Sequence, residues 1–251
     1  MKTLAQRCPE SGVQSVTGLE IMEYVPEDKV HLKTGDIYAC EEGDEFRVLG
    51  PQELSPGGLW GCEYQTWIVN IHIYCRWLLA RFVRQGGNLV QMRLSSLDEA
   101  FDLMPSSGSA KLLVVNCSGR NFDTDPRCNV IRGQAVLVKN AHHKTATRHK
   151  NDGSWSFLIP RPLGGGTIVG GMKQMGDWGS EIRPEETKAI LEAAVRCWPE
   201  FVSKVEDFEV VAVNVVVHGY GAGARGYELS WGVAERIVSL VGREIGEVAK
   251  L

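Results

Sequence analysis

The glycine-rich turn near the end of the chain has the residue types that bind an anion. Gly221, Gly223 and Gly226 spell G-x-G-x-x-G between a β-branched run, Val210–Val217, and an amphipathic helical pattern. Glycines let a ligand approach the backbone closely, and the free N–H groups at a helix start favour negative charge. The turn therefore offers a site for a phosphate or an anionic ring oxygen at the start of the last helix.

The same turn does not fit the first turn of a dinucleotide-binding unit. That unit needs a second strand and an acidic residue about 20 positions beyond the motif. Only 25 residues follow Gly226, and the helical pattern uses most of them. We therefore keep the anion-binding interpretation of the turn and reject the dinucleotide fingerprint.

A second candidate contact follows a short apolar run. Lys111–Asn116 is typical of a buried parallel strand, and Cys117-Ser118-Gly119 come directly after it. Ligands of open α/β sheets bind at the carboxyl ends of the strands. An ordinary turn is the alternative interpretation, and the pattern alone leaves it open.

Composition excludes several classes of function. The 251-residue chain has 27 Lys and Arg against 31 Asp and Glu, for a net charge of −4. It has no apolar stretch long enough for a membrane-spanning helix. We therefore expect no nucleic-acid partner and no membrane segment.

The cysteines and histidines predict neither disulfides nor a metal site. The seven cysteines are odd in number and include no C-x-x-C pair, so we expect free thiols, with Cys75 and Cys117 buried in apolar runs. The histidines within Lys139–Lys150 lack paired ligand spacing. We expect that basic segment to be a surface loop, and we expect no metal.

Hydrophobic periodicity indicates the elements that must position these turns. It predicts strands over Tyr64–Tyr74 and Asn88–Leu94, separated by a helix from Tyr74 that ends at Gly86-Gly87. Phe157–Pro160 and Thr167–Gly170 are expected to form a hairpin. Helices are also expected over Ser96–Phe101, from Pro184 to Trp198, and after Gly226.

Three passages, taken together, carry a resemblance to a known family. They are Val114–Gly119 with Arg132-Gly133-Gln134 downstream, Phe157–Pro162 with Gly170-Gly171, and His218–Gly232. The last passage is the most specific. The chain resembles the D-amino-acid oxidase family of FAD-dependent oxidoreductases, and its fungal members most.

The resemblance implies an α/β fold with mixed α+β character. An incomplete FAD-binding domain of Rossmann type would carry a substrate domain with a mixed β-sheet. Residues 1–75 and 128–213 are assigned to the substrate domain, and residues 76–127 and 214–251 to the FAD-binding domain.

The implied activity is the oxidative deamination of D-amino acids to 2-oxo acids, with ammonia and hydrogen peroxide as the other products. The implied cofactor is FAD, and the implied small-molecule partners are a D-amino acid and O2. The chemistry is hydride transfer from the substrate Cα to the flavin, so no side-chain acid or base is required.

The resemblance also assigns site residues. The flavin would contact main-chain groups at the helix start, and the adenosine half would contact a strand end and a turn. The flavin and adenosine contacts are Leu94, Ser118, Gly223, Gly226, Tyr227 and Glu228. The substrate contacts are Phe157, the Ala224 carbonyl and Arg225.

The sequence departs from the family pattern at three places. The family opens with a strand, a G-x-G-x-x-G turn and a helix that hold the FAD pyrophosphate, and we expect this chain to begin inside that pattern. The stretch with the arginine that binds the substrate carboxylate is absent between Arg196 and Arg225. Phe157 stands where a tyrosine is expected. Arg225 is the first candidate to replace the arginine, and Arg161 is the second.

Two alternatives to a general D-amino-acid oxidase stay open. One is a non-catalytic or unstable member of the family, because the pyrophosphate-binding start and the arginine are absent. The other is an oxidase that prefers D-aspartate, for which Lys139–Lys150 could supply additional cations.

The last three residues, Ala249-Lys250-Leu251, resemble the S-K-L peroxisomal address. Members of the family are commonly peroxisomal. We therefore expect the peroxisome and its import receptor, and otherwise the cytoplasm. A homodimer is one assembly that the resemblance allows.

Overall fold

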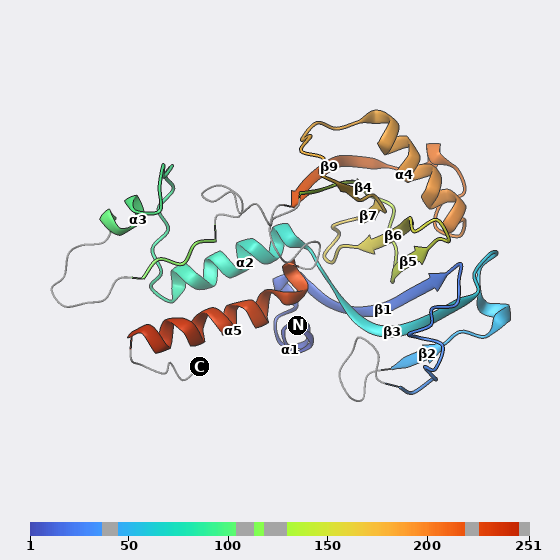
Figure 1. The fold of residues 1–251 in the computed structure, drawn as a ribbon, viewed down its shortest axis with the longest axis horizontal. Coiled ribbons are helices and arrows are strands. Elements are labelled where there is room, and N and C mark those ends of the chain that lie inside the picture. Colours follow the sequence, from blue (N-terminus) through green and yellow to red (C-terminus); the bar gives the residue numbers. More distant parts are fainter. Residues whose placement is uncertain (37–44, 104–112, 118–129, 219–225, 246–251) are drawn as a thin grey trace. The chain divides into compact units, whose positions relative to one another are not determined.

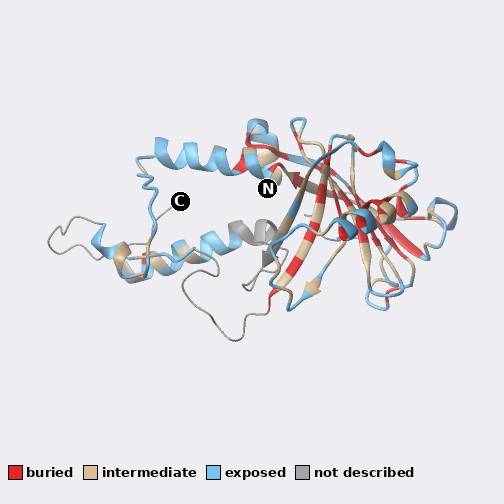
Figure 2. Cartoon of the chain, turned by 90° about the horizontal axis from the view of Figure 1, so that it is seen from above, coloured by how far each residue is buried: buried red, intermediate tan, exposed pale blue. Residues whose placement is uncertain are grey.

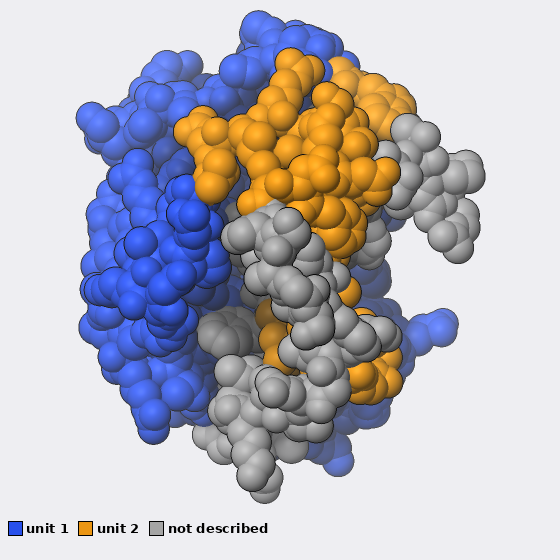
Figure 3. All heavy atoms as spheres, turned by 90° about the vertical axis from the view of Figure 1, so that its left-hand side faces the viewer, with its two compact units in different colours: residues 1–89, 133–173, 180–216 blue, residues 90–132, 174–179, 217–251 orange. Residues whose placement is uncertain are grey.

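The computed structural model describes residues 1–36, 45–103, 113–117, 130–218 and 226–245. The chain divides into two compact units (Figure 3). Unit 1 comprises residues 1–89, 133–173 and 180–216, and unit 2 comprises residues 90–132, 174–179 and 217–251.

A mixed β-sheet forms the frame of unit 1 (Figure 1). Its strands follow the order β2-β3-β1-β5-β6-β7-β4-β8, and β9 also pairs with β4. β1 runs parallel to β5 and antiparallel to β3, which makes the sheet mixed. The strands are β1 (Val13–Met22), β2 (Phe46–Val48), β3 (Trp60–Val69), β4 (Ile131–Val138), β5 (Thr145–His149), β6 (Trp155–Pro160), β7 (Thr167–Gly170), β8 (Gln174–Met175) and β9 (Val210–His218). The pairing of β8 with the first residues of β4 lies within unit 2.

Helix α4 (Pro184–Cys197) lies on one face of the sheet and packs on β6 and β7 (Figure 1). Side chains in β4, β5 and β6 alternate strictly between buried and partly buried positions, as period-2 strands require. The apolar side chains among these buried positions pack with the apolar residues of α4 and form the main core. That core includes Val136, Val138, Ala146, Leu158, Val169, Ile190, Leu191, Ala194 and Trp198.

The other helices are less buried. They are α1 (Lys2–Arg7), α2 (Ile71–Arg84), α3 (Glu99–Asp102) and α5 (Gly226–Ile245). Along α2 only Tyr74 is buried, and Phe82 and Val83 are about half exposed (Figure 2). Among the residues that the structure describes, no helix is long and apolar enough to cross a membrane.

Several predicted elements are confirmed. Phe157–Pro160 and Thr167–Gly170 form the antiparallel β6–β7 hairpin. The helix predicted from Pro184 is α4, the β-branched run is β9, and the glycine-rich turn is followed by α5. The mixed sheet with flanking helices confirms the expected mixed α/β class.

The predicted strand Tyr64–Tyr74 was wrong at its end. β3 ends at Val69, and α2 begins at Ile71. Asn70 turns the chain because its N–H donates to the Gly12 carbonyl and its own carbonyl accepts the first α2 hydrogen bond, from the Tyr74 N–H. The β-branched residues at the start of the helix concealed this change of period.

The surface loop predicted for Lys139–Lys150 was wrong over its second half; residues 139–144 are irregular, as expected. Thr145–His149 is β5, a strand between β1 and β6 in the sheet. The alternation of Thr145, Ala146, Thr147 and Arg148 fits a strand, but the basic and histidine content of the segment masked it. Arg148 is 6% exposed, and its guanidinium donates to Glu23, to Ser55 and to the Pro56 carbonyl.

Two predicted strands before residue 120 are irregular. Asn88–Leu94 forms no strand, and neither does Leu113–Asn116, the part of the apolar run that the structure describes. Leu113 and Val115 are nearly half exposed, where a buried strand was expected. None of these described residues pairs with a neighbouring strand, which would supply hydrogen-bond partners for the backbone N–H and C=O groups. Their apolar composition alone therefore does not produce a strand. Cys75 and Cys117 are exposed rather than buried.

The division into units does not itself assign functions to them. The assignment of residues 1–75 and 128–213 to substrate, and of residues 76–127 and 214–251 to FAD, therefore stays a prediction. The structure places residues 76–89 in unit 1.

The packing of α4 on the sheet predicts the effect of one core substitution. Leu158 is fully buried in the main core, so Leu158→Ala should lower the free energy of unfolding by about 2–5 kcal/mol. Leu59, which is 61% exposed, is the matched control, and Leu59→Ala should change it by less than about 0.5 kcal/mol. Denaturant unfolding of the full chain measures both. Equal effects at the two leucines would contradict this core.

Candidate functional site

The predicted site residues are divided between the two units. Phe157 lies in β6 of unit 1. Leu94 is partly exposed in an irregular segment of unit 2, and Gly226, Tyr227 and Glu228 form the first turn of α5 in the same unit. Ser118, Gly223, Ala224 and Arg225 lie outside the described residues.

Phe157 lies on the sheet face opposite α4, which we call the site face. Its neighbours in β6, Ser156 and Leu158, are fully buried on the α4 side. The register aligns Phe157 with Thr147 of β5 and with Gly170 of β7. Strand alternation therefore places Phe157 between Thr147 and Gly170 in one cross-strand row of the site face.

Glycine allows that ring to lie directly on the sheet. A Cβ atom built on Gly170 would come within 2.3 Å of the Phe157 Cζ, a distance that real Cβ atoms do not adopt. On the same face, a Cβ on Gly18 would lie 2.8 Å from the Tyr64 Cζ. Each ring thus fills the space above a glycine, and this contact limits where the ring can lie.

Arg161 continues the alternation of β6 on the site face. The Arg161 N–H donates to the Gly166 carbonyl over 2.8 Å, which extends the β6–β7 ladder beyond Pro160. The Arg161 Nη2 donates to the Asn70 Oδ1 over 2.7 Å, and the Asn70 Nδ2 donates to the Pro162 carbonyl over 3.0 Å. Asn70 therefore ties the start of α2 to this end of the hairpin.

The turn after Arg161 has a backbone conformation that few residue types adopt. Leu163 and Gly164 both have positive φ, 58° and 71°, and the Gly165 N–H donates to the Pro162 carbonyl. Positive φ at both central positions is the signature of a type I′ hairpin turn. A Cβ on Gly165 would come within 2.6 Å of the Asn70 Nδ2, so the turn also needs a glycine where it meets Asn70.

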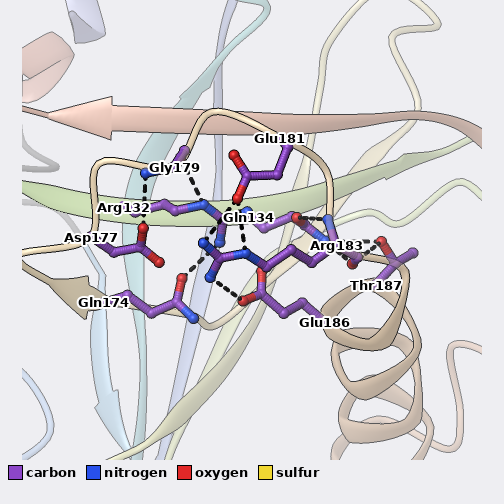
Figure 4. Close-up of polar contacts among 9 residues, drawn as sticks. All are labelled: Arg132, Gln134, Gln174, Asp177, Gly179, Glu181, Arg183, Glu186 and Thr187. Carbon is purple, nitrogen blue, oxygen red and sulfur yellow. Dashed lines mark hydrogen bonds and ion pairs between the residues drawn. The ribbon is translucent and has the colours of Figure 1, made fainter.

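The Arg132-Gly133-Gln134 motif holds neighbouring segments in place (Figure 4). Arg132 is fully buried, and its guanidinium donates to the Gly179 carbonyl and to the Gln174 side chain, all within unit 2. Within unit 1, the Gln134 amide bonds to both backbone groups of Arg183 and to the Thr187 hydroxyl at the start of α4. The motif is therefore structural in this chain.

A cavity of about 340 Å³ opens on the α4 side of the sheet, away from Phe157. Leu19 and Ile21 line it, and they share a face with Ala146 and Arg148 by register. Its charged lining consists of Arg47, Glu53, Glu63, Lys144 and Glu200. Lys144 and Arg148 of the basic segment are thus both engaged on the face opposite Phe157.

The cations of this cavity are already paired. Arg47 donates to Glu53 and Glu63, and the Lys144 Nζ lies 3.1 Å from Glu63. Burial alone would raise the pKa of the Glu63 carboxyl, but the hydrogen bonds from Arg47 and Lys144 outweigh it and hold this pKa below its usual value. The cavity therefore has no unpaired arginine or lysine among its lining residues.

Unit 2 supplies one feature that fits a flavin. α5 begins at Gly226 and runs for 20 residues, so its first turn presents backbone N–H groups and the positive end of the helix dipole. This arrangement suits the anionic ring oxygen inferred from the sequence. Within the described parts of the chain, no group of three or more His, Cys, Asp or Glu side chains could hold a metal ion.

Comparison with known proteins first gives the class of fold. The structure is similar to glycine oxidase from Geobacillus kaustophilus, with a TM-score of 0.55, 15% identity, and coverage of 86% of this chain and 62% of that chain. It is also similar to glycerol-3-phosphate dehydrogenase from Bacillus halodurans complexed with FAD, with a TM-score of 0.56, 13% identity, and coverage of 94% and 53%. The chain thus spans less than two thirds of the length of these flavoenzymes and shares their fold.

Sequence comparison then gives the family. The model of the FAD dependent oxidoreductase family, DAO, matches residues 26–240. The chain is 46% identical to D-aspartate oxidase from Talaromyces thermophilus over 96% of its own length and 70% of that protein. It is 30% identical to D-amino-acid oxidase from Schizosaccharomyces pombe over 92% and 72% of the two lengths. The chain belongs to the D-amino-acid oxidase family of FAD-dependent oxidoreductases, as its sequence motifs predicted.

The matched region also contains gaps. The alignment with the Talaromyces protein extends over 263 positions although it covers 96% of a 251-residue chain. The relative therefore has residues inside the matched region that this chain lacks.

Sequence reasoning missed the Asn70–Arg161 pair. The two residues are 91 positions apart, and only the turn of the chain into α2 brings them together. The Pro162-to-Gly166 spacing signalled the tight turn, but nothing in the local pattern identified Asn70 as its partner.

The contact between Phe157 and Gly170 predicts a coupled pair of substitutions. Gly170→Ala should displace the ring and destabilise the chain by about 1–3 kcal/mol, because the added methyl overlaps the Phe157 ring. In a Phe157→Ala background the same substitution should cost much less. Unfolding of the two single variants and the double variant measures the coupling, and additive effects would refute the contact.

Proposed function

We propose that this protein catalyses the FAD-dependent oxidative deamination of D-amino acids, with D-aspartate preferred. The observation that carries the proposal is the 46% identity to a D-aspartate oxidase over 96% of the chain. The products are a 2-oxo acid, ammonia and hydrogen peroxide, and the partners are the D-amino acid and O2.

The division of roles follows the two units. FAD, when bound, supplies the acceptor for the hydride that leaves the substrate Cα. Unit 1 contributes the site face, on which Phe157 lies over Gly170 and orients the substrate by ring contact alone. Phenylalanine has no hydroxyl, so the polar contacts to the substrate come from other groups.

The remaining assignments are part of the proposal. Phe157, Ala224 and Arg225 contact the substrate. Leu94, Ser118, Gly223, Gly226, Tyr227 and Glu228 contact FAD. A homodimer stays a prediction.

A second candidate is a non-catalytic or unstable member of the family. The observation in its favour is the exposure of apolar side chains in the described part of unit 2. Val90 and Met92 are half exposed or more, and Val233 of α5 is 51% exposed. Exposed apolar surface of this extent favours association or aggregation.

The two candidates predict opposite results for the purified full chain. An oxidase should retain the visible absorption of oxidised flavin after desalting and should release peroxide with D-aspartate faster than with D-alanine. It should release none with L-aspartate, because only the D-enantiomer directs its Cα hydrogen at the flavin. Absorption spectra and a peroxide assay measure these properties. A colourless protein, or one that aggregates with added FAD, would support the second candidate.

We propose further that Ala249-Lys250-Leu251 acts as a peroxisomal import address and binds the import receptor. The tripeptide has the small-basic-Leu pattern that the receptor reads. A fluorescent protein that ends in these three residues should accumulate in peroxisomes, and the same fusion with Leu251→Asp should stay in the cytoplasm. Identical distributions of the two fusions would refute the address.

A further inference from the structure

The cavity on the α4 side of the sheet has features that the proposed oxidation does not use. All of its lining residues belong to unit 1, and it opens away from Phe157. Its volume of about 340 Å³ is large enough for a small ligand, since ligand pockets begin at roughly 300 Å³. Its apolar lining consists of Leu19, Ile21, Leu49, Leu54 and Trp198.

The indole of Trp198 brings an unsatisfied hydrogen-bond donor to this cavity. Trp198 is 2% exposed, and its Nε1–H has no hydrogen-bond partner among the described residues. The Ser156 Oγ is also buried without a partner, but Ser156 does not line the cavity. An indole N–H can only donate, and a buried donor without an acceptor is destabilising. An acceptor oxygen of a ligand in the cavity would satisfy the Trp198 donor.

The charge of the lining favours a cation. Three carboxylates and two basic side chains line the cavity. The carboxylates of Glu53 and Glu63 accept hydrogen bonds from Arg47, whereas the exposed Glu200 makes no hydrogen bond or ion pair with the residues that the structure describes. Burial lowers the pKa of the nearby His142 imidazole, which is therefore neutral at neutral pH and does not balance the charge of Glu200.

We propose that this cavity binds a small amphipathic amine that also carries a hydroxyl or carbonyl oxygen. The ammonium group pairs with Glu200, the oxygen accepts the Trp198 Nε1–H, and the hydrocarbon body packs on Leu19 and Ile21. An anionic ligand fits less well, because both cations of the lining already pair with glutamates. The inference does not depend on the proposed function, since the cavity and Phe157 belong to opposite faces of the sheet.

The test uses three compounds that differ by one polar group. L-Leucinol has a branched hydrocarbon body, an ammonium group and a hydroxyl, and it has no carboxylate. Isopentylamine lacks the hydroxyl, and isohexanol lacks the ammonium group. Calorimetric titration of the full chain, with FAD present, should show saturable binding of leucinol and roughly 2- to 10-fold weaker binding of each of the other two. Leucinol should also raise the temperature of thermal unfolding.

Two substitutions test the polar contacts separately. Glu200→Gln should weaken leucinol binding by roughly 2- to 5-fold and leave isohexanol binding unchanged, because only the ion pair is lost. Glu206→Gln, at an exposed glutamate outside the cavity lining, is the matched control and should change neither. Trp198→Phe removes the N–H donor, so it should weaken the binding of leucinol but not that of isopentylamine.

A third substitution tests the location of the ligand. Leu54 is a partly buried lining residue, and Leu54→Trp should fill the cavity and abolish the binding of all three compounds. Thermal unfolding of each variant separates lost binding from lost folding. Glu200→Gln and Leu54→Trp carry the test if Trp198→Phe does not fold.

Each outcome decides the inference whether or not the chain oxidises D-amino acids. A loss of leucinol binding in the cavity variants, with the expected dependence on the compound, would support it. Absence of saturable binding would overturn it, as would leucinol binding that survives Leu54→Trp or that falls equally in Glu200→Gln and Glu206→Gln. Tighter binding of isocaproate, an anion with the same kind of hydrocarbon body, would also overturn the assignment to an amine.

Discussion

The contact between α4 and the mixed sheet is the constraint on which the candidate site depends. Ile190, Leu191 and Ala194 of α4 cover the face that carries Leu158 and Val169. Because side chains alternate along a strand, sealing one face assigns every second residue of β6 to the other. A register shift of one residue would exchange Phe157 with Leu158 and remove the site.

Glycines give the site face its shape. Gly170 and Gly18 sit beneath Phe157 and Tyr64, and any side chain at either glycine would occupy the space of the ring. Each ring therefore packs directly over the backbone of a glycine and not over a neighbouring side chain. The glycine beneath each ring therefore limits how far the ring can move.

The distribution of charge distinguishes the two faces. On the α4 side, Arg47, Lys144 and Arg148 are all neutralised by glutamates, so these cations serve the fold. On the site face, Arg161 is held by the neutral amide of Asn70. Among the described residues, the cations named on the two faces therefore differ in their partners: carboxylates hold those on the α4 side, and a neutral amide holds Arg161.

The sequence by itself determined the family, the β6–β7 hairpin, α4 and the helix after the glycine-rich turn. These features depend on short-range patterns: turn glycines, a proline at a helix start, and period-2 or period-3.6 apolar residues. Only the tertiary structure decided that Thr145–His149 is a strand, because its neighbours β1 and β6 satisfy its backbone and Glu23 pairs with Arg148. It likewise decided that Leu113–Asn116 is not a strand. The Asn70–Arg161 pair was beyond sequence reasoning because it joins residues 91 positions apart, and contacts at that separation depend on how the whole sheet is assembled.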